Sequence, residues 1–207
     1  MVLKNILRII IDYRLSLIKI IFFEFIYIFR GYKGNNFDFS RNLTMSDNIP
    51  CPYYFLLKIK KILKNNKFNT FIDLGCGSGR VLNFFNKKFN NKNFIGVEYF
   101  YDQYSQSKKL FNKNENIEIL QGDFTKMDLY KENADCYFLN NPFKNDSEFI
   151  IFFENLINYV SRDKDIFFIF INYNFNVIKN LKKIIPIEHF YVSDIKGYSV
   201  CCLHKNK

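Results

Sequence analysis

Three glycines follow an acidic residue where an apolar run ends, in the stretch F-I-D-L-G-C-G-S-G-R at residues 71–80. Glycine lets a backbone turn tightly and approach a ligand closely. In open α/β sheets, ligands bind at the carboxyl ends of the strands, and a loop after an apolar strand lies there. The spacing is G-x-G-x-G, whereas a dinucleotide site favours G-x-G-x-x-G. We therefore predict a binding loop formed by Asp73, Gly75, Cys76, Gly77 and Gly79.

A second apolar run also ends on an acid. Residues 93–98 read N-F-I-G-V-E, so Glu98 follows Asp73 by 25 residues (98 − 73 = 25). A carboxylate at a strand end can accept both hydroxyl protons of a ribose. Nicotinamide enzymes use the same geometry, so Glu98 alone does not choose the cofactor. The alternative for a single acid at this place is a solvated helix start.

The D-L-G-x-G-x-G run resembles the first motif of class I S-adenosylmethionine-dependent methyltransferases, in which this loop wraps the methionine part of the cofactor. The resemblance implies S-adenosyl-L-methionine as cofactor. It extends to Q-G-D-F at residues 121–124, where Asp123 would meet the adenine amino group and Phe124 would lie against the ring. Tyr99 and Gly122 join the expected cofactor-binding residues as their neighbours. Without the resemblance, Asp123 reads as a turn acid that caps the next helix.

The segment L-N-N-P-F at residues 139–143 resembles the D/N-P-P-Y/F motif of amino-group methyltransferases. There the first side chain and a backbone carbonyl accept hydrogen bonds from the target nitrogen, and the aromatic ring packs against it. The resemblance implies Asn140, Pro142 and Phe143 as catalytic residues, with Asn140 also at the cofactor. Asn141 stands where that family has its first proline. The alternative is a rigid loop that closes the cofactor pocket.

Residues 34–143 together resemble small bacterial methyltransferases often found among surface-polysaccharide genes. Some lysine methyltransferases with an N-terminal hydrophobic helix share the G-R and G-x-E pattern. The methyl acceptor therefore stays open: an amino group or a sugar hydroxyl of a glycan or small molecule, or a protein lysine. Rival interpretations are a non-catalytic assembly partner with this fold and a nicotinamide oxidoreductase.

Apolar patterns along the chain predict alternating strands and helices, which implies an α/β fold. We expect a Rossmann-like seven-stranded, mostly parallel sheet with helices on both faces and a C-terminal antiparallel hairpin. Strands are predicted over residues 68–74, 93–98, 117–120, 134–140, 166–172, 189–193 and 198–203, and helices over 53–65, 80–89, 101–111, 147–160 and 177–183. Residues 1–50 would hold an N-terminal helix and a connecting segment, and residues 51–207 the methyltransferase domain.

The N-terminal 30 residues predict an amphipathic helix with a narrow polar stripe. The apolar run at residues 16–29 is interrupted by Lys19 and Glu24, which makes it too short to span a membrane. Its apolar face could pack on its own domain, on a second subunit in a homodimer, or on a membrane surface. No secretory cleavage site follows. We expect a cytoplasmic protein, or one at the inner face of the membrane. The stripe comprises Lys4, Asn5, Arg8, Asp12, Ser16 and Lys19, and Arg14 and Glu24 break it.

Composition constrains partners and compartment. The chain has 207 residues and a net charge of +10, but its lysines are scattered, which favours a solvated lysine face over a nucleic-acid groove. The five cysteines form no zinc or disulfide pattern, so we expect buried thiols in a reducing compartment and no metal. Arg80 could neutralise the cofactor carboxylate or pair with an acid in the core. His189 and His204 lie far along the chain from the motifs, so neither is expected to act as a base.

Overall fold

The computed structural model describes most of the chain between residues 18 and 205. The described ranges are residues 18–34, 50–65, 67–129, 131–140, 143, 145–160, 166–171, 177, 187–191 and 200–205, with the backbone alone for the last two. Several predicted features lie outside these residues: Pro142, the hairpin turn at residues 194–197, and all of the predicted helix at residues 177–183 except Val177.

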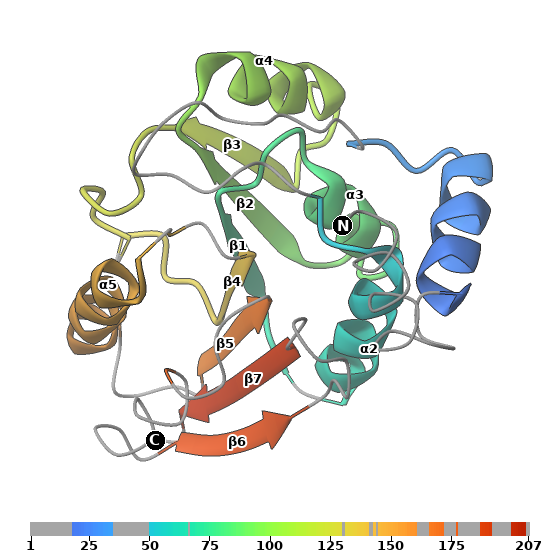
Figure 1. The fold of residues 1–207 in the computed structure, drawn as a ribbon. Helices are drawn as coiled ribbons and strands as arrows, with labels where there is room; N and C mark the ends of the chain where they lie inside the picture. Colours follow the sequence, from blue (N-terminus) through green and yellow to red (C-terminus); the bar gives the residue numbers. More distant parts are fainter. Residues whose placement is uncertain are drawn as a thin grey trace, which may run out of the picture.

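A parallel sheet of five strands forms the centre of the molecule (Figure 1). Neighbouring strands pair in parallel in the order β3-β2-β1-β4-β5. The chain thus leaves β1 first toward one edge and then toward the other, which creates a topological switch point between β1 and β4. The expectation of a Rossmann-like α/β sheet is confirmed for these strands. They are β1 Thr70–Leu74, β2 Asn93–Glu98, β3 Ile117–Gln121, β4 Cys136–Asn140 and β5 Ile166–Ile171.

Beyond β5, the backbone of two further segments pairs antiparallel. β7 (Val200–Lys205) lies beside β5, and β6 (Ile187–Tyr191) lies beside β7. β6 begins two residues before its predicted run at 189–193, and β7 begins two residues after the start of its predicted run at 198–203. An offset of two residues keeps every side chain on the same face of a strand, so the pattern alone could not fix the boundaries.

Helices cover both faces of the sheet (Figure 1). α2 (Tyr53–Lys64), α3 (Arg80–Asn86) and α4 (Tyr101–Leu110) contribute to the apolar core on one face, and α5 (Asp146–Tyr159) contributes to the core on the other. α3 ends three residues before its predicted end. Beyond it, the carbonyl of Phe85 is shared between the N–H of Lys88, three residues on, and the N–H of Phe89, four residues on, so the last turn is irregular.

Strand β5 shows why both faces must be covered. All six of its side chains are buried. Phe167, Ile169 and Ile171 face the core beneath α2 and α3. The alternate residues Ile166, Phe168 and Phe170 face the core beneath α5. This arrangement fits the nearly unbroken apolar run in the sequence, which is typical of a strand in a parallel sheet with helices on both sides.

The N-terminal helix, residues 18–29, packs against the face that carries α2 and α3. The ring of Tyr27 stacks on that of Tyr53 with 4.9 Å between centroids, and it lies 5.4 Å from that of Phe84. Ile20, Phe23 and Ile26 are half-buried against the same core. Of the alternatives left open for this helix, its inner face therefore packs on its own domain. None of the described helices is both long and apolar enough to cross a membrane.

Gly34 brings the chain after this helix against the start of α3. Its φ is +82°, and a Cβ added there would lie 2.3 Å from the backbone nitrogen of Arg80 and 2.7 Å from the carbonyl carbon of Gly79. Neither backbone atom can move without shifting the glycine loop. Gly31 also has a positive φ, +70°, but an added Cβ would meet nothing within 4 Å.

These two glycines make a matched pair for a stability experiment. Gly31→Ala should cost about 1 kcal/mol through backbone conformation alone. Gly34→Ala should cost a further 1–3 kcal/mol, roughly, because its Cβ overlaps backbone atoms. Urea denaturation of both variants measures the difference. Equal losses would mean that the segment after the N-terminal helix does not pack against the loop.

Candidate functional site

The carboxyl ends of β1, β2 and β3 are tied together by Glu98. Its Oε2 accepts a hydrogen bond from the backbone N–H of Gly77 in the glycine loop, at 2.8 Å. Its Oε1 accepts one from the N–H of Phe100, also at 2.8 Å, and its backbone carbonyl accepts one from the N–H of Gly122, at 3.0 Å. The side chain is 5 % exposed. Three segments predicted to bind the cofactor therefore meet at this residue.

The glycine loop is held against β2 by its backbone. The N–H groups of Gly75 and Cys76 both donate to the carbonyl of Val97, at 2.9 and 3.0 Å. Gly77 has φ +54°, and Gly79, which precedes α3, has φ +90°. A Cβ on Gly79 would also lie 2.5 Å from the ring of Phe111, so that position requires glycine in both conformation and space.

Cys76 is buried and faces the sheet rather than the loop's open side. A Cβ placed on Gly96 of β2 would lie 2.8 Å from its sulfur atom. Burial raises the pKa of the Cys76 thiol, and the nearby carboxylates of Asp73 and Glu98 raise it further. The thiol is thus neutral and part of the packing, so a contribution of Cys76 to a ligand would come from its backbone.

Asp73 is a buried acid with an unsatisfied oxygen atom. Its side chain is 1 % exposed, and its Oδ2 has no hydrogen-bond partner among the described residues. Burial raises its pKa well above the usual range, and the neighbouring Glu98 carboxylate raises it further. Two acids at adjacent strand ends repel each other and favour a ligand that brings positive charge.

Asp123 follows β3 and forms a tight turn with its own neighbours. Its Oδ1 accepts hydrogen bonds from the N–H and the hydroxyl of Thr125, at 3.0 and 2.6 Å, and its Oδ2 pairs with Lys126 at 3.0 Å. Partial burial opposes ionisation, but the bonds from Thr125 and Lys126 outweigh it and lower the pKa of Asp123. The carboxylate is therefore ionised, and it has the contacts of the turn acid that was the alternative interpretation.

The aromatic residues near this turn differ in exposure. Phe124 is 4 % exposed, and its ring lies 5.6 Å from that of Phe143 and 5.2 Å from that of Phe152. Tyr99, directly after Glu98, is largely exposed. Tyr99 therefore offers more accessible ring surface at the sheet edge than Phe124 does. The roles of both residues toward a cofactor stay predictions.

Asn140 ends β4, the strand next to β1. Leu74 pairs with Leu139, so Asn140 lies one residue beyond the level where β1 gives way to the glycine loop. It is half-buried. Phe143 is also half-buried, and its ring contacts those of Phe124, Phe149 and Phe152. The structure thus joins the segment after β4 to the segment after β3 through a cluster of rings.

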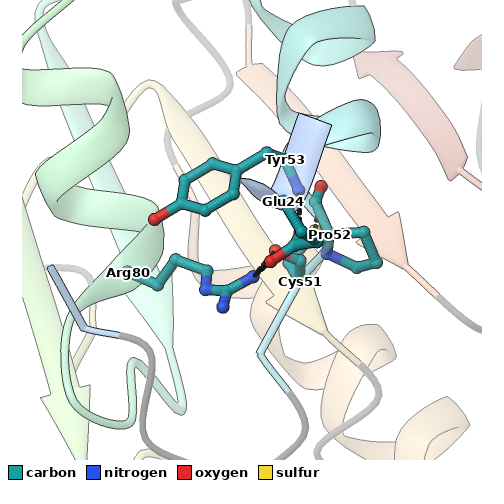
Figure 2. A network of polar contacts seen from close by, with 5 residues as sticks. All are labelled: Glu24, Cys51, Pro52, Tyr53 and Arg80. Atoms are coloured by element: carbon teal, nitrogen blue, oxygen red, sulfur yellow. Dashed lines mark hydrogen bonds and ion pairs between the residues drawn. The ribbon is translucent and has the colours of Figure 1, made fainter. Parts of the chain in front are cut away.

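Arg80 is fixed by the N-terminal helix (Figure 2). Its Nη1 forms an ion pair with Glu24 at 2.8 Å and bonds to the carbonyl of Cys51 at 3.3 Å. The guanidinium lies 4.6 Å from the ring centre of Tyr53, whose N–H donates to the other oxygen of Glu24. Of the two roles considered for Arg80, these contacts favour pairing with an acid over neutralising a cofactor.

A family model for the methyltransferase domain matches residues 71–162, from the start of β1 through α5. The matched segment contains the glycine loop, Glu98, Asp123 and Asn140. The chain is an S-adenosylmethionine-dependent methyltransferase. Comparison with curated proteins gives no match.

Solved structures with the same fold include several methyltransferases. An RNA methyltransferase from Salinibacter ruber in complex with S-adenosyl-L-homocysteine has 16% identity and a TM-score of 0.58, covering 77% of this chain and 95% of that one. A SAM-dependent methyltransferase from Aquifex aeolicus has 16% identity and a TM-score of 0.56, covering 76% and 100%. The plantazolicin methyltransferase BpumL in complex with S-adenosyl-L-homocysteine has 13% identity and a TM-score of 0.56, covering 75% and 84%. At these identities the likeness concerns the fold.

The site of this methyltransferase fits S-adenosyl-L-methionine. The cofactor carries an ammonium and a sulfonium, and the unsatisfied Oδ2 of Asp73 lies at a strand end where an ammonium would satisfy it. Asp73 and the loop from Gly75 to Gly79 would hold the methionine part, and Glu98 the ribose. The positive charges would also relieve the repulsion between the Asp73 and Glu98 carboxylates.

Sequence reasoning did not foresee the role of Glu24. A signal was present, because Glu24 interrupts the apolar run of the helix where a solvent-facing acid would fit poorly. A charged residue on an otherwise apolar face suggests a buried partner. No pattern in the sequence connects Glu24 with Arg80, however, because the two are 56 residues apart.

The Asp73→Asn variant tests the fit to the cofactor. A raised pKa means that the folded state disfavours the ionised acid. The wild type without cofactor therefore loses stability as pH rises from about 4 through that raised pKa. The asparagine cannot ionise, so its melting temperature should exceed the wild-type value by a margin that grows with pH.

The same variant should bind S-adenosyl-L-methionine about tenfold or more weakly, because it loses a charged hydrogen bond of about 1.5–3 kcal/mol. Thermal melts at pH 5 and pH 8 and isothermal titration measure the two effects. A variant that is less stable at both pH values and binds normally would remove Asp73 from the site.

The ion pair between Glu24 and Arg80 gives a second prediction. Glu24→Gln leaves the guanidinium, 5 % exposed, without a countercharge. Removing one partner of a buried pair costs about 3–5 kcal/mol. We expect about 2–3 kcal/mol, because the Glu24 side chain is 24 % exposed. Asp128→Asn, which breaks the exposed pair with Lys131, is the matched control and should change stability little. Equal effects of the two variants on urea denaturation would contradict the coupling.

Proposed function

We propose that this methyltransferase transfers its methyl group to an amino nitrogen held at Asn140. The observation that carries the proposal is the position of Asn140 at the carboxyl end of β4, immediately beside the strand that leads into the glycine loop. The topological switch point of an open α/β sheet lies between these two strands, and ligands bind there. An acceptor at Asn140 would therefore lie next to the cofactor.

The chemistry divides between cofactor and protein. The sulfonium of S-adenosyl-L-methionine supplies an activated methyl group, so the protein needs to bind, orient and exclude water. The side-chain oxygen of Asn140 accepts a hydrogen bond from the acceptor N–H, which directs the nitrogen lone pair. Phe143 offers an apolar surface beside it, and Phe124 and Phe152 hold that ring in place.

An amine is favoured over a hydroxyl because an amine that arrives deprotonated needs no general base. A histidine base would have to lie at the carboxyl ends of the parallel strands, where the acceptor binds. The backbone of His204 instead pairs with Phe167, near the amino end of β5. His189 pairs with Leu203, itself opposite Phe168 in the middle of β5. Asp146, which begins α5 and is exposed, is the described acid nearest in sequence to Phe143.

A sugar hydroxyl is the second candidate acceptor, with Asp146 as its base. The resemblance of residues 34–143 to methyltransferases of surface-polysaccharide genes supports it. A protein lysine is a further form of the amine proposal, supported by the shared G-R and G-x-E pattern.

We also infer that an antiparallel C-terminal hairpin completes the sheet to seven strands, which the backbone pairing of β7 with β5 and β6 supports.

A panel of acceptors tests the proposal. Purified enzyme with methyl-labelled cofactor is offered simple amines, lysine peptides and amino sugars, and matched compounds with hydroxyls but no amine. Label should enter the amines, at a rate that rises with pH as the amine loses its proton. Transfer to the hydroxyl compounds alone would replace the amine by the second candidate.

Asn140→Ala tests the residue itself. Cofactor affinity should stay within a few-fold, because all the other expected cofactor contacts follow β1, β2 and β3. Turnover should fall by about 10²-fold if Asn140 orients the acceptor. Asn145→Ala, at an exposed position just before α5, is the matched control and should change neither quantity. Single-turnover transfer and cofactor titration measure both. Unchanged turnover in Asn140→Ala would leave this segment as scaffold.

A further inference from the structure

The N-terminal helix, residues 18–29, has a second apolar face that points away from the domain. Its side chains recur at the i, i+3, i+4 spacing of one helical stripe. Phe25 is 60 % exposed and Phe29 is 86 % exposed. Among the described residues, this helix holds six of the nine large apolar side chains that are exposed. We call them the outer face: Ile18, Ile21, Phe22, Phe25, Ile28 and Phe29.

An apolar stripe of this kind calls for a partner. Monomeric proteins rarely expose contiguous apolar surface of this extent unless it binds something. The inner face already accounts for the packing of the helix on its domain, since Tyr27 and Glu24 make their contacts there. The outer face is therefore not needed to hold the helix in place.

Positive charge gathers beside the outer face, mainly at the C-terminal end of the helix. Lys19 and Arg30 belong to the helix and its end, and both are exposed. From α3 and the turn that follows it, the amino group of Lys87 lies 4.2 Å from the ring centre of Tyr32 and donates to the carbonyl of Gly31. The amino group of Lys88 lies 5.6 Å from the same ring. Cations thus gather where the helix ends.

In the described segments next to the outer face, negative charge does not balance these cations. In the sequence of residues 18–34, α2 and α3, the single acidic residue is Glu24. Its carboxylate is paired with the buried Arg80 and so is not available to the surface. The described face of the N-terminal helix is therefore apolar along its length and cationic where the helix ends.

We propose that the outer face binds the surface of an anionic lipid bilayer. Phenylalanine and isoleucine side chains enter the boundary between headgroups and acyl chains, and flanking lysine and arginine residues contact lipid phosphates. A second copy of this chain is a poorer partner, because both faces would carry the same uncompensated positive charge. In this arrangement the helix lies along the bilayer surface.

Vesicle sedimentation with the full-length protein tests the apolar part of the proposal. Vesicles of phosphatidylcholine alone are compared with vesicles that contain a quarter phosphatidylglycerol. The protein should sediment with the anionic vesicles, and less so at higher salt. Phe25→Ser with Phe29→Ser should weaken partition about tenfold or more. Ile151→Ser on α5, which removes an equally exposed apolar side chain, should not.

A pair of charge reversals tests the cationic part of the proposal. Arg30→Glu with Lys87→Glu lowers the net charge from +10 to +6 (10 − 4 = 6), and so does Lys108→Glu with Lys109→Glu on α4. The first pair should reduce binding to anionic vesicles much more than the second. Equal losses would mean that net charge alone drives binding and would overturn a docking face.

Three other results would also overturn the proposal. The first is a wild type that stays in the supernatant with both vesicles. The second is a dimer in light scattering that Phe25→Ser with Phe29→Ser dissociates without any lipid effect, because the face would then bind a second copy. The third is a large fall in the melting temperature of that variant, because the face would then be covered by the rest of the chain. Vesicle binding is measured without methyl transfer, so its outcome does not depend on the proposed acceptor.

Discussion

The hydrogen bonds that converge on Glu98 hold the ligand-binding edge of this methyltransferase together. A single buried residue accepts from the glycine loop through its carboxylate and from the segment after β3 through its carbonyl. An ionised carboxylate bound to backbone N–H groups is a strong and directional contact. The loop after β1 and the loop after β3 therefore cannot move independently. Because the carboxylate belongs to the last residue of a buried strand, the sheet itself sets their positions.

A second constraint links this edge to the N-terminus. Arg80 begins α3 immediately after the glycine loop. Its guanidinium forms an ion pair with Glu24 and lies over the ring of Tyr53. Taking a guanidinium out of water is costly, and the carboxylate, the Cys51 carbonyl and the aromatic ring together offset that cost. The backbone of Gly34 packs against the backbone of Gly79 and Arg80. The N-terminal helix is thus attached to the domain at the base of the loop and not at a remote point.

The sequence predicted the parts of this fold that depend on local pattern. The parallel strands and the glycine loop follow from apolar runs that end in glycines and acids, and β5 follows from its unbroken run of apolar residues. Pairings between distant residues left no such trace. The hydrogen bond from the N–H of Gly77 to Glu98 and the pair of Arg80 with Glu24 depend on how the strands and helices pack. Boundaries such as the end of α3 were also missed, because the last turn is decided by backbone hydrogen bonds rather than by side-chain periodicity.

Charge is distributed unevenly over the molecule, and each part of the distribution has a physical consequence. Asp73 and Glu98 lie together at the ligand-binding edge, where burial and then the Glu98 carboxylate raise the pKa of Asp73. Two neighbouring acids favour a cationic ligand there. The opposite sign prevails at the end of the N-terminal helix, where Arg30, Lys87 and Lys88 lie close to the apolar stripe. The pair of Glu24 with Arg80 lies between these two regions and connects them over the length of two side chains. A surface that binds the helix is consequently held at a fixed distance from the glycine loop.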